Sequence, residues 1–206
     1  LAGGDWNAIL GFVGFAVGIG AGTFFLKRGY SLKRTYSLPK FDTAVMPVLM
    51  VGLLILVVMA PAFIFFSEKG PGAVHAFWAV SLIAGIVVGG LAQYTRLCMV
   101  GGIRDIILFH ETKLLMGFVA VFVAAFLVNL AFGNFHPGFA NQPIAHTDGL
   151  WNFLGMALAG FCSILLGGCP MRQLIMTGEG NTDSAITVLG LVIGAAFAHN
   201  FGLAAS

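Results

Sequence analysis

Charge is scarce in this sequence: only 9% of its 206 residues are Asp, Glu, Lys or Arg. A soluble domain of average composition carries about a quarter charged residues, so this composition argues against a soluble protein. Hydrophobic residues make up 59%, and several apolar runs approach or exceed the roughly 20 residues that cross a bilayer. We therefore predict an all-α, polytopic integral membrane protein with about six transmembrane helices.

Motifs for metals, nucleotides and nucleic acid are also missing. The three cysteines form no Cys-x-x-Cys pair, and the five histidines are scattered singly, so we expect no metal site. His136 and His146 share a loop with Asp148 but lack a spacing that supports a metal site. No GxxxxGK[ST] loop is present, so ATP use is not implied, and we expect no cofactor. A net charge of +2 gives no indication of nucleic acid binding.

Six apolar segments are long enough to be considered as spans, and we expect residues 1–206 to form a single transmembrane domain. Proline and glycine separate the second segment from the third in the predicted turn Ser67–Gly72. The segments are approximately Asn7–Leu26, Ala44–Phe66, Ala73–Gln93, Leu114–Phe132, Phe153–Gly168 and Ser184–Leu203.

The basic residues predict an orientation. Residues 27–40 are strongly basic and are expected on the cytoplasmic side, following the positive-inside rule. Alternating crossings then put Arg96–Lys113 and Arg172 inside, and the 133–152 loop, which has no Lys or Arg, outside. Only Lys69 of the ten basic residues falls outside. This distribution supports six crossings with both termini outside, and we expect the membrane to be a cell inner membrane.

Glycines on the first segment predict close helix contact. Gly14, Gly18 and Gly22 form two overlapping small-xxx-small patterns, which let a neighbouring backbone approach closely in a membrane. The pattern is common in apolar sequence, so it identifies no particular partner.

Two polar passages interrupt the apolar pattern, at 94–113 and 167–183. In the second, Gly167, Gly168 and Pro170 disfavour a continuous helix, and a new helix is expected near Thr182 or Asp183. We predict broken or re-entrant helices at both passages. A broken helix end that presents backbone groups, a thiol and a guanidinium can hold an anion inside a membrane protein.

The two passages resemble each other, which indicates an internal duplication. Each has a glycine pair, one cysteine and a following arginine, and a weaker third copy has Ser31 near the place of the cysteine. Matching polar breaks in successive parts of a membrane chain point to a central binding site. The members of the two passages are Cys98, Gly101, Gly102, Arg104 and Asp105 in the first, and Gly167, Gly168, Cys169, Arg172 and Gln173 in the second.

The segments GGLAQYTRLCMVGGIRD and LLGGCPMRQLIMTGEGNTD resemble the signature segments of the YeeE/YedE family of sulphur-compound transporters. The family includes thiosulfate permeases, and the sequence is most similar to its YedE-like branch, which is linked to selenium metabolism. The resemblance covers about residues 11–199 and implies that the chain is the C-terminal half of a longer transporter built from two related halves. It also implies that Cys98 and Cys169 contact the substrate sulphur; nothing is implied for Cys162, which we expect to pack.

The sequence thus predicts a substrate site at the two helix breaks. Arg104 and Arg172 are costly in lipid, so each should face a cavity, a carboxylate or the surface, with Asp105 as an available partner of Arg104. Gln173 and Asn181 could bind ligand or cap helix ends. The expected substrate-binding residues are Cys98, Cys169, Arg104, Arg172, Gly101, Gly102, Gly167, Gly168, Gln173 and Asn181.

The leading functional hypothesis is transport of a small sulphur- or selenium-containing anion into the cytoplasm, without enzymatic activity. One alternative is a membrane-bound transferase that passes sulphur or selenium through a persulfide on Cys169, which needs a reactive thiolate. The other is a subunit that docks a soluble sulphur-carrier protein through the basic residues 27–40. Expected partners are the anion, membrane lipid, and the N-terminal half or such a carrier protein.

Overall fold

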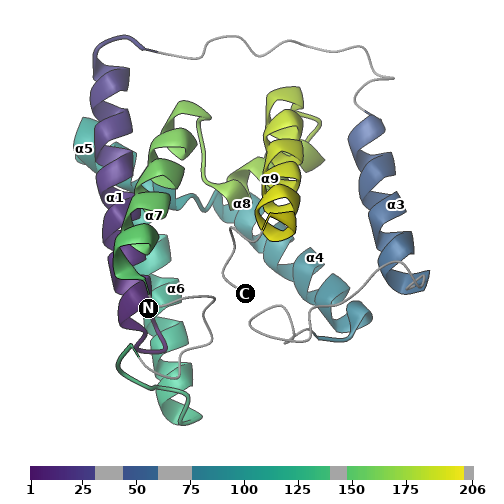
Figure 1. Ribbon diagram of the computed structural model, residues 1–206, viewed down its shortest axis with the longest axis horizontal. Helices are drawn as coiled ribbons and strands as arrows, with labels where there is room; N and C mark the ends of the chain where they lie inside the picture. The colour runs from purple at the N-terminus through teal and green to yellow at the C-terminus, as the bar shows by residue number, and fades with distance from the viewer. Residues whose placement is uncertain (31–43, 60–75, 140–147, 202–206) are drawn as a thin grey trace. The chain divides into compact units, whose positions relative to one another are not determined.

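The computed structural model describes residues 1–30, 44–59, 76–139 and 148–201. Within these ranges the chain forms α-helices and one isolated bridge, between Asp5 and Gly138, and no strand, which confirms the predicted all-α fold (Figure 1). The helices are α1 (Trp6–Lys27), α3 (Val45–Met59), α4 (Trp78–Thr95), α5 (Met99–Phe109), α6 (Lys113–Ala131), α7 (Gly149–Leu165), α8 (Pro170–Gly178) and α9 (Thr182–Asn200).

Each of the six apolar segments contains a helix. Four stretches are long and apolar enough to cross a membrane: Trp6–Lys27, Trp78–Phe109, Lys113–Ala131 and Gly149–Gly178. Two shorter apolar helices, Pro47–Met59 and Thr182–Ala198, account for the second and sixth segments. Large apolar side chains along these helices are exposed, as is expected of surfaces that face lipid. The chain is therefore a membrane protein.

Carboxylate caps define where two of the long helices begin. Asp5 accepts a hydrogen bond from the backbone N–H of Asn7 at 2.9 Å at the start of α1. Asp148 accepts from the N–H groups of Leu150 and Trp151, at 3.1 and 3.3 Å, at the start of α7. These side chains satisfy N–H groups that have no partner within the helix, so α7 begins four residues before the predicted Phe153.

Both predicted helix breaks are present, and each contains a short helix. In the 94–113 passage α4 ends at Thr95 and α6 begins at Lys113, with α5 between them. In the 167–183 passage α9 begins at Thr182, as predicted, but Pro170 opens α8 instead of lying in irregular chain. Proline has no N–H to lose in the first turn of a helix, so it can begin a helix that it would disrupt further along.

The chain divides into two compact units. The first contains α1, α5, α6, α7 and the start of α8, up to Arg172. The second contains α3, α4, α9 and the rest of α8. Within the second unit, the side-chain amide of Gln93, near the end of α4, donates to the carboxylate of Glu179 just beyond α8.

Helices α1 and α7 form the main packing contact of the first unit, and they run parallel (Figure 1). A Cβ atom placed on Gly14 would overlap the Phe153 backbone, and one on Gly18 would overlap the Ala157 carbonyl oxygen. On Gly22 it would lie 2.8 Å from the Ile164 side chain. The predicted close contact through these three glycines is confirmed, and its partner is α7.

The start of α1 lies at the same end of the first unit as the chain that follows α6. The N–H of His136 donates to the Gly3 carbonyl at 2.9 Å, and the N–H of Trp6 donates to the Gly138 carbonyl at 3.2 Å. Since α7 runs parallel to α1, the start of α7 lies at this end too. This agrees with the predicted placement of the N-terminus and the 133–152 loop on one side. Most of the basic stretch 27–40, Ser31, His146 and the turn Ser67–Gly72 lie outside the described residues.

Candidate functional site

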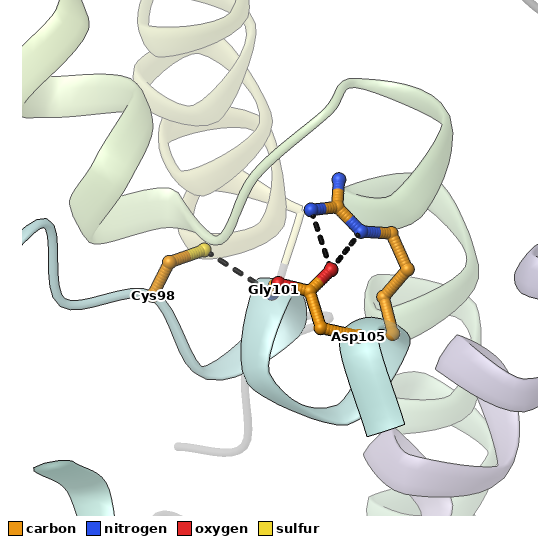
Figure 2. Close-up of polar contacts among 4 residues, drawn as sticks. Cys98, Gly101 and Asp105 are labelled. Atoms are coloured by element: carbon orange, nitrogen blue, oxygen red, sulfur yellow. Dashed lines mark hydrogen bonds and ion pairs between the residues drawn. The ribbon is translucent and has the colours of Figure 1, made fainter. Parts of the chain in front are cut away.

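Cys98 and Cys169 each stand directly before one of the two short helices. Cys98 is the N-cap of α5, with extended backbone (φ −150°, ψ 109°), and the N–H of Gly101 donates to its Sγ at 3.3 Å (Figure 2). Cys169 immediately precedes Pro170, the first residue of α8, and the backbone N–H of Arg172 is a partner of its Sγ. Gly101 and Arg172 lie at the same distance along the chain from their cysteines, so each sulphur accepts from the first turn of its own helix.

The two thiols meet. Cys98 and Cys169 belong to one buried cluster, their side chains interact, and both cysteines are reduced. Each sulphur also interacts with a backbone N–H of the other passage. The N–H of Cys169 interacts with Cys98, and the N–H of Met99 interacts with Cys169. The starts of α5 and α8 are thus brought together around two sulphur atoms, within the first unit.

The walls around the sulphurs are apolar and come from distant parts of the sequence. Phe15 and Ile19 of α1 and Ile164 of α7 belong to the same buried cluster as the two cysteines and Val100. Phe15 and Ile19 lie near the middle of the 22-residue helix α1, which is about 33 Å long. These apolar residues were not predicted as part of the site; the glycine pattern of α1 was the one signal in the sequence that this helix approaches another helix.

The same backbone pattern precedes both cysteines. Two residues before Cys98, Arg96 has a left-handed backbone with φ 52°, and two residues before Cys169, Gly167 has φ 81°. The predicted resemblance of the passages therefore extends to their conformation, and the cysteines are the matching positions. The glycine pairs are not: Gly101 and Gly102 lie inside α5, whereas Gly167 and Gly168 precede α8.

Gly167 and Gly168 end α7. The N–H of Gly167 donates to the Ile164 carbonyl at 3.1 Å, and the N–H of Gly168 donates to the Ser163 carbonyl at 3.0 Å. This is the Schellman pattern, in which a residue with positive φ satisfies the last carbonyl groups of a helix. The glycine pair thereby reverses the chain so that it returns to α8 (Figure 1).

Gly102 has a packing position at the junction of α5 and α6. A Cβ atom there would lie 3.0 Å from the backbone nitrogen of Leu115, so a side chain would push α6 away. A Cβ atom on Gly101 would lie 3.5 Å from Cys98 Sγ, an ordinary contact distance. Gly101 thus lies directly beside the Cys98 thiol. Gly102 allows α5, which begins after Cys98, to pack closely against α6.

Arg104 is paired with Asp105, the partner expected from the sequence. The guanidinium donates from Nε at 2.9 Å, and its terminal nitrogen lies 2.8 Å from the same carboxylate oxygen (Figure 2). The side chains are 35% and 18% exposed, respectively. Arg104 also interacts electrostatically with Cys98, so the ion pair belongs to the surroundings of the thiols.

The remaining candidates lie on the second half of the 167–183 passage. Asn181 accepts from the N–H of Ser184 at 3.0 Å, which makes it a cap of α9, one of its two predicted roles. Gln173 is buried in α8 at 2% exposure. Both belong to the second unit. The prediction that Cys162 packs is wrong for the described residues, because Cys162 is exposed on α7. Hence the contacts within the first unit bring together Cys98, Cys169, Gly101 and the Arg172 backbone.

A comparison with protein families identifies the chain. A model of the family described as sulphur transport matches residues 94–205, which include both cysteine passages. No curated protein and no solved structure matches the chain. The matched region covers more than half of the sequence and begins just before the first helix break. A membrane protein with this match and this arrangement of helices belongs to the sulphur transport family, YeeE/YedE.

Proposed function

We propose that the protein moves a small sulphur-containing anion such as thiosulfate, or its selenium analogue, into the cytoplasm along a path past Cys98 and Cys169. The observation that carries this proposal is the meeting of two reduced thiols at the starts of two short helices inside one buried cluster. The family supports transport of a sulphur compound. The choice of anion, the direction and the role of the thiols are our proposal.

Helix starts suit an anion because their N–H groups and the helix dipole present positive partial charge. The Gly101 N–H donates to Cys98, and the N–H groups of Met99, Cys169 and Arg172 also interact with the two sulphurs. An anion that reaches this place can accept hydrogen bonds from them and from the S–H groups, which are weak donors. A neutral thiol offers a donor without repelling the anion, whereas a thiolate would repel it.

Charge near the thiols adds long-range attraction. Arg104 lies close enough to Cys98 to interact with it, and Asp105 neutralises part of its charge. The proposed binding residues also include Arg172, Gly102, Gly167 and Gly168, as direct contacts or as residues that hold the helix ends in place. Gln173 and Asn181, which belong to the second unit, remain predictions from the sequence.

The lengths of the short helices fit a site inside the membrane. At 11 and 9 residues, α5 and α8 are about 16 and 14 Å long, roughly half of a bilayer's hydrocarbon core. Phe15 and Ile19 share the thiols' cluster and lie near the middle of α1. We therefore propose re-entrant or broken helices at 94–113 and 167–183, in a single inner-membrane domain with residues 27–40 cytoplasmic.

Uptake of radiolabelled thiosulfate by inverted and right-side-out vesicles tests the proposal, with selenite and sulfate as competitors. We expect Cys98→Ala and Cys169→Ala to lose most uptake, and Cys162→Ala, an exposed thiol on α7, to retain it. Removing one sulphur atom costs on the order of 1 kcal/mol of packing, so insertion and thermal stability should change little. Normal uptake by the double variant Cys98→Ala, Cys169→Ala would exclude the thiol mechanism.

The same vesicles separate the alternatives. A transferase would gain the mass of one sulphur atom on Cys169 when given a sulphur donor, and would show no net uptake. A docking subunit would bind a sulphur-carrier protein through the basic residues 27–40 and would transport nothing. Measuring uptake with and without the N-terminal half implied by the family resemblance tests whether this part of the chain transports by itself.

A further inference from the structure

The facing thiols suggest a second property besides anion binding. Cys98 and Cys169 are both reduced, are 7% and 6% exposed, and are partners of each other. The third thiol, Cys162, is exposed and does not belong to the buried cluster of the other two. We infer that Cys98 and Cys169 form a reversible disulfide when the protein meets a small two-electron oxidant such as hydrogen peroxide, and that this bond closes the transport path.

The covalent step balances with peroxide as the oxidant. The sulphur of one cysteine attacks peroxide, the O–O bond breaks, and a sulfenic acid and one water form. The second thiol then attacks the sulfenic sulphur, expels a second water and makes the S–S bond. The two cysteines are oxidised by two electrons, and peroxide is reduced to two waters. A dithiol such as dithiothreitol reverses the bond by thiol–disulfide exchange and is itself oxidised.

The backbone on both sides permits this bond with small movements. A disulfide needs two sulphurs about 2 Å apart and Cα atoms within roughly 7 Å. Each cysteine stands in extended or irregular chain just before a helix, not within one, so its side chain can rotate without breaking a helical turn. Because the two cysteines belong to one buried cluster and their side chains interact, we expect rotation about the Cα–Cβ bonds and an approach of the starts of α5 and α8 to bring the sulphurs together.

Oxidation would remove what the proposed transport requires, so the effect on uptake rests on the proposed function. A disulfide has no S–H, so both sulphur donors are lost. It also ties the start of α5 to the start of α8, so the two helix ends cannot separate to admit an anion. Burial restricts access to small oxidants, whereas Cys162 is exposed and lies outside the buried cluster of the other two thiols.

Mass spectrometry of the full chain tests the bond without any substrate. Purified protein in nanodiscs is treated with hydrogen peroxide, unfolded, alkylated and digested. We expect a peptide pair joined through Cys98 and Cys169, one remaining alkylated thiol at Cys162, and three alkylated thiols after dithiothreitol. The pair should persist in Cys162→Ala and be absent in Cys98→Ser and Cys169→Ser, while all three variants insert normally.

The outcomes separate this inference from the proposed function. If peroxide yields sulfinic acid on either cysteine, or joins Cys162 instead, the inference is wrong, whatever the uptake assay gives. If the bond forms and reverses but no variant carries thiosulfate, the proposed function fails while the disulfide stands. In the Cys162→Ala protein, peroxide should lower uptake to that of the Cys98→Ala, Cys169→Ala double variant, and dithiothreitol should restore it. Oxidised protein that still transports would refute closure.

Discussion

Under the proposed function, the ion pair of Arg104 with Asp105 moderates the attraction of the site for an anion. The guanidinium's Nε hydrogen bond and its ion-pair contact go to the same carboxylate oxygen of the adjacent residue, so the charge of the arginine is partly balanced. An arginine without such a partner would bind a passing anion more tightly and release it more slowly. In a transporter, binding must be weak enough to permit release.

Asp105→Asn should therefore lower the thiosulfate concentration for half-maximal uptake, by about twofold to fivefold, because a partly exposed pair contributes up to about 1 kcal/mol. Maximal uptake should fall as release slows, and Arg104→Gln should raise the half-maximal concentration. Concentration-dependent uptake measures both. Asp148→Asn is the matched control: asparagine caps a helix as well as aspartate does, so α7 should be unaffected. Unchanged half-saturation in Asp105→Asn would contradict this role.

At the scale of a helix, the two ends of α7 are determined by different chemistry. Asp148 begins it with a side-chain cap, and the glycine pair Gly167–Gly168 ends it by reversing the chain. The reversal allows Cys169 to return to Cys98. The corresponding bend before Cys98 uses Arg96 at φ 52°, a conformation that costs a non-glycine residue about 1 kcal/mol.

Gly167→Ala should destabilise the protein by about 1 kcal/mol, because alanine at φ 81° brings its Cβ close to backbone oxygen. Gly155→Ala, within the preceding helix α7, is the control: apart from its own stretch of helix, no atom of the described chain lies within 4 Å of a Cβ there. Thermal unfolding in detergent, followed by tryptophan fluorescence, compares the two variants. Equal melting temperatures would mean that the positive φ at Gly167 is not needed.

The contact of α1 with α7 gives a second prediction at this scale. Gly18→Leu should separate the helices and lower stability by several kcal/mol, since its side chain would meet the Ala157 carbonyl oxygen. A Cβ atom on Gly20, two residues further along α1, would have no atom of the described residues within 4 Å apart from its own stretch of helix, so Gly20→Leu should be tolerated. Yield and melting temperature in detergent report the difference. If both variants unfold alike, α1 and α7 do not pack through this face.

For the whole molecule, the charge distribution and the helix directions can be compared. Parallel α1 and α7, with α6 ending beside Gly3, place Asn134 and the start of α1 at one end of the first unit. Arg28, at the other end of α1, belongs to the basic stretch expected in the cytoplasm. Contacts within the unit thus place Asn134 and Arg28 at opposite ends of α1. The distribution of Lys and Arg likewise predicts that they lie on opposite sides of the membrane.

A cysteine introduced at Arg28 should be labelled by a membrane-impermeant maleimide only from the cytoplasmic side, and one at Asn134 only from outside. The first unit separates these positions by the length of α1, about 33 Å. Intact cells report labelling from outside, and inverted vesicles report labelling from the cytoplasmic side. A variant background without Cys162 removes the exposed native thiol. Labelling of both positions from one side would contradict the predicted topology.

The membrane class, the positions of the helix breaks and the family followed from the sequence. Apolar runs of bilayer length leave few alternatives to membrane helices, because backbone groups must be paired within lipid. Gly167 and Gly168 indicated the end of a helix from local conformational preference, which needs no knowledge of the rest of the chain. The charged pair Arg104–Asp105 was predictable for the same reason, since its members are neighbours.

Tertiary structure decided which of these local features meet. Local preferences could not show that Pro170 begins a helix, because proline disrupts a helix or opens one depending on where the preceding turn ends. Nor could the glycine patterns select α7 as the partner of α1. Above all, Cys98 and Cys169 lie 71 positions apart in the sequence and meet through the packing of α1, α5 and α7 and the reversal after α7. Such a contact depends on how the chain folds back over a long distance, which no local pattern specifies.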